Sequence, residues 1–335
     1  MSHVLHRSFT SNVPVIVDAD GAYLIDSEGR RYLDACGGAA VACLGHSEPR
    51  VRDAIRAQLD RVAYTHTGFF TNEPAEALAG HLVARAPEGA GDGRVMYLGS
   101  GSEAMEAAIK LARQYHLERG EPQRQKLVAR HFSYHGNTLG ALAVGGHAAR
   151  RKPYDPMLID VAYIDPCYAY RYREPQEEAA AFGRRMADQL EAKLVELGPE
   201  TVAAFIAEPV VGATLGTQPA ASGYFKRIRE ICDRHGVLFI ADEVMCGMGR
   251  TGSLFALEQE GIAADITTMA KGLGGGFQPI AALLARQSVC DVIIGGSGRL
   301  WNGHTYMSHA TSCAGALAVL KVIEEDDLLA NVRAR

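Results

Sequence analysis

Short, continuously apolar runs alternate along most of the chain with longer amphipathic stretches. Strands with one exposed face alternate apolar and polar residues, so an unbroken apolar run predicts a strand that is buried on both faces. The apolar runs are Arg94–Leu98, Lys126–Arg130, Val161–Ile164, Val202–Ala207, Val237–Ala241, Asp265–Ala270 and Ile280–Ala285. The amphipathic stretches include Glu103–Arg119, Glu177–Leu197 and Gly223–His235, and predict helices. Strand and helix alternating in this order predict an α/β fold with a mostly parallel sheet and helices on both of its faces.

The two ends of the chain depart from this alternation. Tyr23–Asp26 and Tyr32–Asp34 lie on either side of a polar turn and predict a two-stranded hairpin. The final stretch, Ala310–Arg335, has the pattern of one long helix. We therefore expect residues 1–60 to form the N-terminal part of a small domain and residues 61–309 to form the large domain. Residues 310–335 would form a helix that leads out of the large domain.

The composition and charge of the chain limit its class. Its 335 residues are 47% hydrophobic and 22% charged, which is usual for a soluble globular protein. The formal net charge is −5 and no basic patch stands out, so nucleic acid is not an expected partner. No apolar run is long enough to span a bilayer, and the seven cysteines include no C-x-x-C pair. We therefore expect a cytoplasmic protein with no membrane segment and no structural disulfide.

Residues able to carry chemistry follow four of the predicted strands. Glu208, Asp242 and Lys271 each come directly after an apolar run, and the turn Gly99–Ser102 follows another. In an open α/β sheet, ligands bind beyond the carboxyl ends of the strands. These two acids, the lysine and the glycine–serine turn are therefore expected to line one crevice.

The glycine–serine turn predicts the start of a helix. Ser100 and Glu103 have the spacing of a capping box. The free N–H groups and the positive dipole end of such a helix favour a phosphate. Taken alone, the same sequence is also consistent with an ordinary, well-capped helix that binds nothing.

The acidic pair Asp242–Glu243 has other interpretations. A strand that ends in Asp-Glu is also how a nucleotide hydrolase presents its magnesium carboxylate. That class needs a loop of the form G-x-x-x-x-G-K-[ST], and no lysine of this chain follows a glycine. Asp242 could also cap a following helix. His131 and His135 lie four residues apart but lack the adjacent glutamate of a zinc-binding helix, so we predict no metal.

Lys271 lies between an apolar strand and the glycine-rich run Gly272–Gly276. Partial desolvation there favours a neutral, nucleophilic amine, and the glycines let a ligand approach the backbone closely. A single lysine after a strand is more often an ordinary surface group. Together, however, a lysine amine, a carboxylate and a phosphate-binding helix terminus are what pyridoxal 5′-phosphate needs. Tyr134, after another strand, offers an aromatic plane for the ring.

These residues lie within a longer pattern that resembles the class III (ω-amino acid) aminotransferases. Members of that family have the aspartate-aminotransferase-like fold, known as fold type I. The similarity extends from Tyr23 to about Leu320. The matching stretches are Phe239–Val244, Gly247–Gly252, Asp265, Lys271–Gly276, Gly101–Ala104, Tyr134–Gly136, Glu208–Gly212 and His304–Tyr306.

The resemblance implies a role for individual residues. Lys271 would form the Schiff base with the cofactor and move the proton, and Asp242 would pair with the ring nitrogen. Phe69 and Phe70 match a region that often lines the substrate pocket of the partner subunit. The other implied cofactor contacts are Val244, Tyr134, His135, Glu208, Gly101, Ser102 and, from the neighbouring subunit, Thr305.

The implied reaction moves an amino group from an amine or ω-amino acid to a keto acid, such as pyruvate or 2-oxoglutarate. The resemblance also implies a homodimer with shared active sites. The same cofactor site could serve an aminomutase, an epimerase or a decarboxylase, and the chain could be an inactive binding relative. Family members continue into a C-terminal small domain with an arginine for the substrate carboxylate. We expect this chain to stop before that domain.

Overall fold

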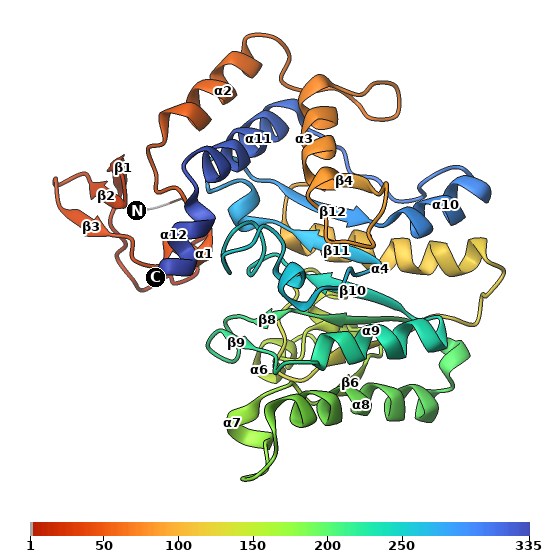
Figure 1. The fold of residues 1–335 in the computed structure, drawn as a ribbon. Coiled ribbons are helices and arrows are strands. Elements are labelled where there is room, and N and C mark those ends of the chain that lie inside the picture. The colour runs from red at the N-terminus through yellow and green to blue at the C-terminus, as the bar shows by residue number, and fades with distance from the viewer. Residues whose placement is uncertain (1–2) are drawn as a thin grey trace.

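The computed structural model describes residues 3–335, so the first two residues of the expected 1–60 segment lie outside it. A seven-stranded sheet forms its centre, in the order β4-β12-β11-β10-β7-β5-β6 (Figure 1). The strands are β4 (Arg94–Leu98), β5 (Lys126–Arg130), β6 (Ala162–Ile164), β7 (Val202–Ala207), β10 (Leu238–Asp242), β11 (Ile266–Met269) and β12 (Ala281–Ala285). All neighbours pair in parallel except β12, which is antiparallel to both β11 and β4. The mostly parallel sheet predicted from the apolar runs is confirmed.

The sheet is buried on both faces because successive residues of a strand point to opposite sides. Ile240 belongs to the apolar cluster beneath α4 (Gly101–Glu118). Its neighbour Phe239 belongs to the cluster beneath α8 (Ala179–Leu197) and α9 (Tyr224–His235). A third cluster joins β12 to α3 (Glu73–Ala84) and α11 (Ala310–Glu325). This double covering explains why the strands are continuously apolar in sequence.

The other elements are short or lie around this core. The remaining helices are α1 (Gly37–Ala40), α2 (Pro49–Leu59), α5 (Leu139–Val144), α6 (Ala148–Arg151), α7 (Ala169–Tyr172), α10 (Gln287–Gly295) and α12 (Leu328–Ala334). The 3-10 turns within residues 3–335 are η1 (Asp155–Met157), η2 (Pro199–Thr201), η3 (Ala256–Glu260) and η4 (Lys271–Leu273). The strands β8 (Val210–Val211) and β9 (Gln218–Pro219) form a separate two-stranded sheet.

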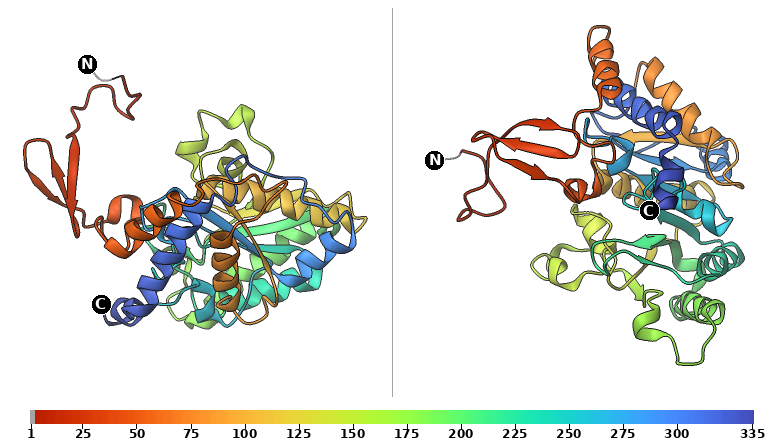
Figure 2. Two further views of the ribbon diagram at one scale, coloured as in Figure 1. Left: turned by 90° about the horizontal axis from the view of Figure 1, so that it is seen from above. Right: turned by 60° about the vertical axis from the view of Figure 1, so that its left-hand side comes forward.

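A three-stranded antiparallel sheet near the N-terminus stands away from the main body (Figure 2). It consists of β1 (Ile16–Asp20), β2 (Tyr23–Asp26) and β3 (Arg31–Leu33). The predicted hairpin corresponds to β2 and β3. The sequence does not reveal β1, because its residues are almost all exposed and show no apolar alternation. The division into three units remains a proposal, and α2 of the first segment packs against α11 of the last.

The prediction of one continuous helix over Ala310–Arg335 is wrong. The chain forms α11 and then α12, with a break at Asp326 and Asp327. Asp327 has a φ of +48°, in the left-handed region that ends a right-handed helix and that aspartate tolerates better than most residues. Arg50 in α2 donates to the Asp326 carboxylate at 2.6 Å. The break is therefore tied to a neighbouring helix, a contact that periodicity alone does not contain.

Candidate active site

A cavity of about 570 Å³ lies at the edge of the main sheet where the parallel strands end. The turn after β4, the end of β10 and the residues after β7 and β11 all reach it. The structure brings together every residue predicted to contact the cofactor except Thr305. These residues are Gly101, Ser102, Tyr134, His135, Glu208, Asp242, Val244 and Lys271. Residues far apart in sequence share this site because the carboxyl ends of parallel strands meet at one edge.

The N-terminus of α4 forms one wall of the cavity. The Ser100 hydroxyl accepts the backbone N–H of Glu103 at 3.3 Å, as expected for a capping residue. The Glu103 carboxylate accepts the N–H of Gly99 at 2.7 Å, one residue further back than in the usual capping box. The first N–H groups of a helix have no partner within it, so those of Gly101 and Ser102 are open to an anion.

Asp242 is held rigidly at the end of β10, with only 4% of its surface exposed. One carboxylate oxygen lies 2.7 Å from Nδ1 of His135. The other accepts the backbone N–H of Val244 at 3.0 Å. Two partners on different segments thus fix the plane of this carboxylate, which is the kind of support that a catalytic acid needs.

Lys271 follows β11 and begins the turn η4. Its φ is +44°, a left-handed conformation that is uncommon for a residue with a side chain. Its carbonyl accepts the N–H groups of Gly274 and Gly275 at 3.1 and 3.0 Å, so the turn is well defined. Backbone strain of this kind concentrates at functional sites, where the surrounding structure maintains it. The backbone conformation of Lys271 is thus a structural feature of the site that its sequence motif does not show.

Glu208 and Tyr134 form another part of the wall. The Glu208 carboxylate lies 3.4 Å from the backbone nitrogen of Tyr134 and 3.3 Å from that of Gly212. Burial raises the pKa of the Glu208 carboxyl because desolvation disfavours its charged form, while the nearby His135 opposes that effect. Nearby Asp242 raises the same pKa further. Glu208 is therefore a second buried acid in the cavity, held by longer hydrogen bonds than those of Asp242.

Thr305, Phe69 and Phe70 do not line the main cavity. Thr305 is exposed and lines a neighbouring hollow that shares Gln278 and Pro279 with the main cavity. Phe69 is 81% exposed and Phe70 is 66% exposed. The resemblance placed Thr305 and the two phenylalanines in the site of a partner subunit, so their roles stay predictions.

The cavity also has lining residues that sequence reasoning did not single out. They include Arg7, the segment Ala39–Val41 and Arg150. In sequence, Arg150 belongs only to a basic run, Arg150–Lys152, that is too short to indicate a nucleic-acid site. Arg150 belongs to the short helix α6, which does not directly follow a strand of the main sheet. Its position in the sequence therefore does not predict that it lines the cavity.

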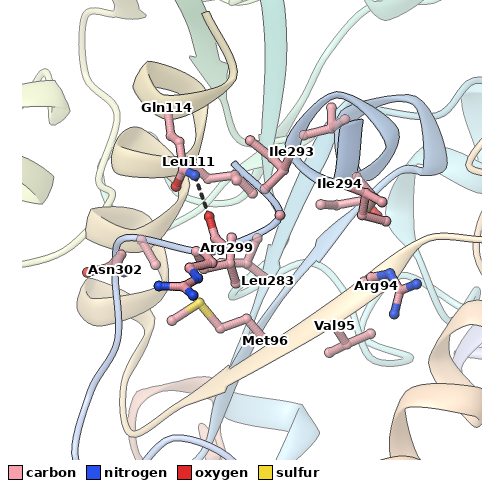
Figure 3. A pocket seen from close by; sticks show the side chains of 16 residues that line it. Arg94, Val95, Met96, Leu111, Gln114, Leu283, Ile293, Ile294, Arg299 and Asn302 are labelled. Atoms are coloured by element: carbon pink, nitrogen blue, oxygen red, sulfur yellow. Dashed lines mark hydrogen bonds between the residues drawn. The ribbon is translucent and has the colours of Figure 1, made fainter. Parts of the chain in front are cut away.

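A second cavity, of about 390 Å³, lies between α4, α10 and the strands β4 and β12 (Figure 3). Its walls are mainly apolar and include Met96, Leu111 and Ile293. Inside it, the Gln114 amide donates to the carbonyl of Arg299 at 2.6 Å. None of the residues predicted for the site lines it. The chemistry of the chain is therefore assigned to the first cavity.

Residues 3–335 contain neither a metal-binding cluster nor a helix suited to a membrane. No group of three or more histidine, cysteine, aspartate or glutamate side chains is arranged to hold a metal ion in that part of the chain. No helix within the same residues is both long and apolar enough to cross a membrane. All seven cysteines are free thiols.

Glu243 follows Asp242 but belongs to the protein interior, with no exposed surface. Its carboxyl group accepts the backbone N–H of Ala256 at 2.6 Å and that of Leu257 at 3.0 Å. Burial raises the pKa of Glu243 to about 7, although these two hydrogen bonds oppose the shift. The residue therefore anchors the start of η3 to the end of β10.

This raised pKa predicts a specific pH dependence of stability. Between the ordinary value of 4.5 and about 7, the unfolded chain ionises Glu243 while the folded chain keeps the proton. The contribution of Glu243 to the free energy of unfolding is thus fully present below pH 4.5 and is lost as the pH rises to about 7. The loss amounts to at most about 3 kcal/mol. Urea unfolding at both ends of this range should show that Glu243→Gln lacks this loss. The exposed Glu200→Gln is the control, and equal pH slopes for wild type and Glu243→Gln would contradict the prediction.

Known proteins resemble this chain over almost its whole length. The model of the family described as aminotransferase class-III matches residues 6–335. An aminotransferase of Gibberella zeae is 46% identical over 325 residues, which cover 95% of this chain and 63% of the relative. An uncharacterized aminotransferase of Schizosaccharomyces pombe is 43% identical over 329 residues, covering 98% of this chain and 71% of the relative. The crystal structure of a PLP-bound amine transaminase from an uncultivated Pseudomonas species superposes with a TM-score of 0.91, at 36% identity, over 99% of this chain and 76% of that one.

The sheet topology and the cavity at its carboxyl edge define an α/β enzyme fold of type I, as predicted. Within that class, the chain belongs to the class III aminotransferase family, which confirms the resemblance found in its sequence. The chain spans 63% of the length of the Gibberella zeae relative. The relatives described here are aminotransferases or transaminases, so they do not favour the alternative reactions on the same cofactor.

Proposed function

We propose that this chain binds pyridoxal 5′-phosphate and transfers an amino group from an amine or ω-amino acid to a keto acid such as pyruvate or 2-oxoglutarate. The observation that carries the proposal is the meeting of three features in one cavity. They are the N-terminus of α4, the buried carboxylate of Asp242 and the amine of Lys271. Together they match the phosphate, the ring nitrogen and the aldehyde of that cofactor. Membership of the family supports the same reaction.

The shape of the cavity also fits the cofactor. A side chain at Gly101 would meet Cγ1 of Val244 at 2.9 Å, and one at Gly136 would meet Oγ of Ser102 at 2.6 Å. Gly136 also has a φ of +140°, which residues with side chains rarely adopt. These two glycines keep space open beside the helix terminus, where Gly101 and Ser102 would hold the phosphate. Tyr134 and Val244 would cover the two faces of the ring.

When bound, the cofactor supplies an electron sink for the negative charge that develops on the substrate carbon. Asp242 supports this chemistry because a carboxylate beside the ring nitrogen favours a proton on that nitrogen. His135 and the backbone N–H of Val244 keep the Asp242 carboxylate in position. The Lys271 amine would hold the cofactor and, once released by the incoming substrate, act as the base that moves the proton.

We further infer a homodimer that works in the cytoplasm. Large apolar side chains are exposed at Phe69, Phe70, Trp301 and Tyr306, by 81, 66, 63 and 68%. Exposed apolar residues of this size are typical of contact surfaces when they gather in a patch. Thr305, predicted to reach the phosphate in the partner's site, directly precedes Tyr306. The free thiols fit a reducing compartment.

The test uses the purified chain with added pyridoxal 5′-phosphate and a panel of amines, with pyruvate or 2-oxoglutarate as acceptor. We expect a visible absorption band from the bound cofactor and formation of alanine or glutamate in step with loss of the donor. The absence of both the band and the product would contradict the proposal. Product from one amino substrate without any keto acid would instead indicate one of the alternative reactions.

A further inference from the structure

Arg150 lines the proposed cofactor cavity, is exposed to solvent and has no acidic partner among residues 3–335. It comes from α6, and its guanidinium carbon lies 4.7 Å from the centre of the Tyr134 ring. Among residues 3–335, no carboxylate forms an ion pair with it. The adjacent Arg151 is different, because it pairs with Asp155 at 3.9 Å and stacks on Tyr163 at 5.0 Å. Arg151 therefore makes contacts that stabilise the fold, whereas Arg150 lines the cavity.

The acidic residues that line the cavity are buried, whereas the arginines that line it are exposed. The acids that line it, Glu208 and Asp242, are 5 and 4% exposed and accept hydrogen bonds from protein groups. Arg150 and Arg7 line the same cavity but are exposed. An anionic group on a substrate would therefore meet cations at the mouth, and its amine would be directed inward to Lys271.

We propose that Arg150 binds a carboxylate of the substrate, which makes amino acids and keto acids the preferred substrates over simple amines. This inference rests on the proposed aminotransferase function and adds a subsite to it. A guanidinium presents a planar fork of N–H donors that matches the two oxygens of a carboxylate. The Tyr134 ring beneath it limits the conformations of Arg150, so less entropy is lost on binding.

A purely structural role is the competing explanation. Arg150 could serve only to brace Tyr134 by stacking, in which case its loss would harm every substrate equally. A carboxylate-binding role affects only substrates that carry the carboxylate. Paired substrates of equal length therefore distinguish the two roles.

The first measurement compares β-alanine with propylamine as donors to the holoenzyme. Arg150→Ala should lower kcat/KM for β-alanine at least about tenfold, mainly through KM, and change that for propylamine less than about twofold. Arg150→Lys should restore part of the loss, because it keeps the charge but not the fork. Arg171→Ala is the matched control, since Arg171 is also an arginine over a tyrosine ring, at 5.3 Å from that of Tyr170, but outside the cavity.

The second measurement needs no turnover. Calorimetric titration of the holoenzyme with propionate should show binding that Arg150→Ala weakens at least about tenfold and Arg171→Ala leaves unchanged. Equal losses for both donors, or unchanged propionate affinity in Arg150→Ala, would overturn the carboxylate subsite. If no donor reacts with the wild-type protein, the proposed function fails, but the propionate titration still decides the role of Arg150.

Discussion

Replacing Lys271 with alanine is expected to abolish amino transfer, with a fall in rate of about 10⁴-fold or more. Among residues 3–335, Lys271 is the only lysine that lines the cavity. The part of the chain that the structure describes therefore offers no other amine there to hold the cofactor or to move the proton. The left-handed backbone at Lys271, with φ at +44°, begins the turn that presents this lysine to the cavity.

The Lys271→Ala prediction is checked by two readouts. Borohydride reduction followed by peptide mass spectrometry should find the cofactor attached to Lys271 in the wild type and to no residue in the variant. Single-turnover assays measure the loss of rate. Lys226→Ala is a suitable control because Lys226 is an exposed lysine on α9, outside the cavity. Transamination by Lys271→Ala at a tenth of the wild-type rate would refute the assigned role.

The sequence predicted the central sheet well because the strands are buried on both faces. Burial selects unbroken apolar runs, and these mark β7 and β10 clearly. The same rule locates Asp242 and Lys271, since residues directly after parallel strands must gather at one edge. Their meeting in one cavity follows from topology and needs no side-chain detail.

Features set by contacts between distant segments were not predictable in this way. Strand β1 is exposed, so hydrophobic burial leaves no trace in its sequence. The break between α11 and α12 depends on Asp327 in a left-handed conformation and on the contact of Arg50 with Asp326. Arg150 reaches the cavity from a helix of four residues, for which periodicity carries no information.

Two buried aspartates of the main sheet allow catalytic and structural roles to be separated. Asp242 lines the cavity and is held by His135. Asp265 precedes β11 and is 3% exposed, but it pairs with Arg229 at 2.7 Å and Arg286 at 3.1 Å and does not line the cavity. Both residues belong to the family signature in the sequence, yet only the structure shows that their surroundings differ.

Asp242→Asn is expected to lower kcat by about 10²- to 10⁴-fold, because a neutral amide no longer favours a proton on the ring nitrogen. The amide also has one acceptor oxygen where the carboxylate has two. The Asp242 carboxylate is now contacted by His135, by the Val244 N–H and, at 3.5 Å, by the Thr268 hydroxyl, so one of these groups would lose its acceptor at a cost of about 1–3 kcal/mol. Stopped-flow kinetics and urea unfolding measure the two effects separately.

Asp265→Asn should reduce stability strongly and kcat only slightly, the opposite of what is expected for Asp242→Asn. It removes the buried charge that Arg229 and the partly exposed Arg286 share, while Arg229 keeps its second partner Asp233. The free energy of unfolding is therefore expected to fall by up to about 3–5 kcal/mol, the cost of breaking a buried ion pair. The fraction that remains folded should react within a few-fold of the wild-type rate, because no bond in the site depends on Asp265. If Asp265→Asn lowers the kcat of folded protein as much as Asp242→Asn does, the loss reflects general disruption of the sheet. The assignment of Asp242 to the cofactor ring would then fail.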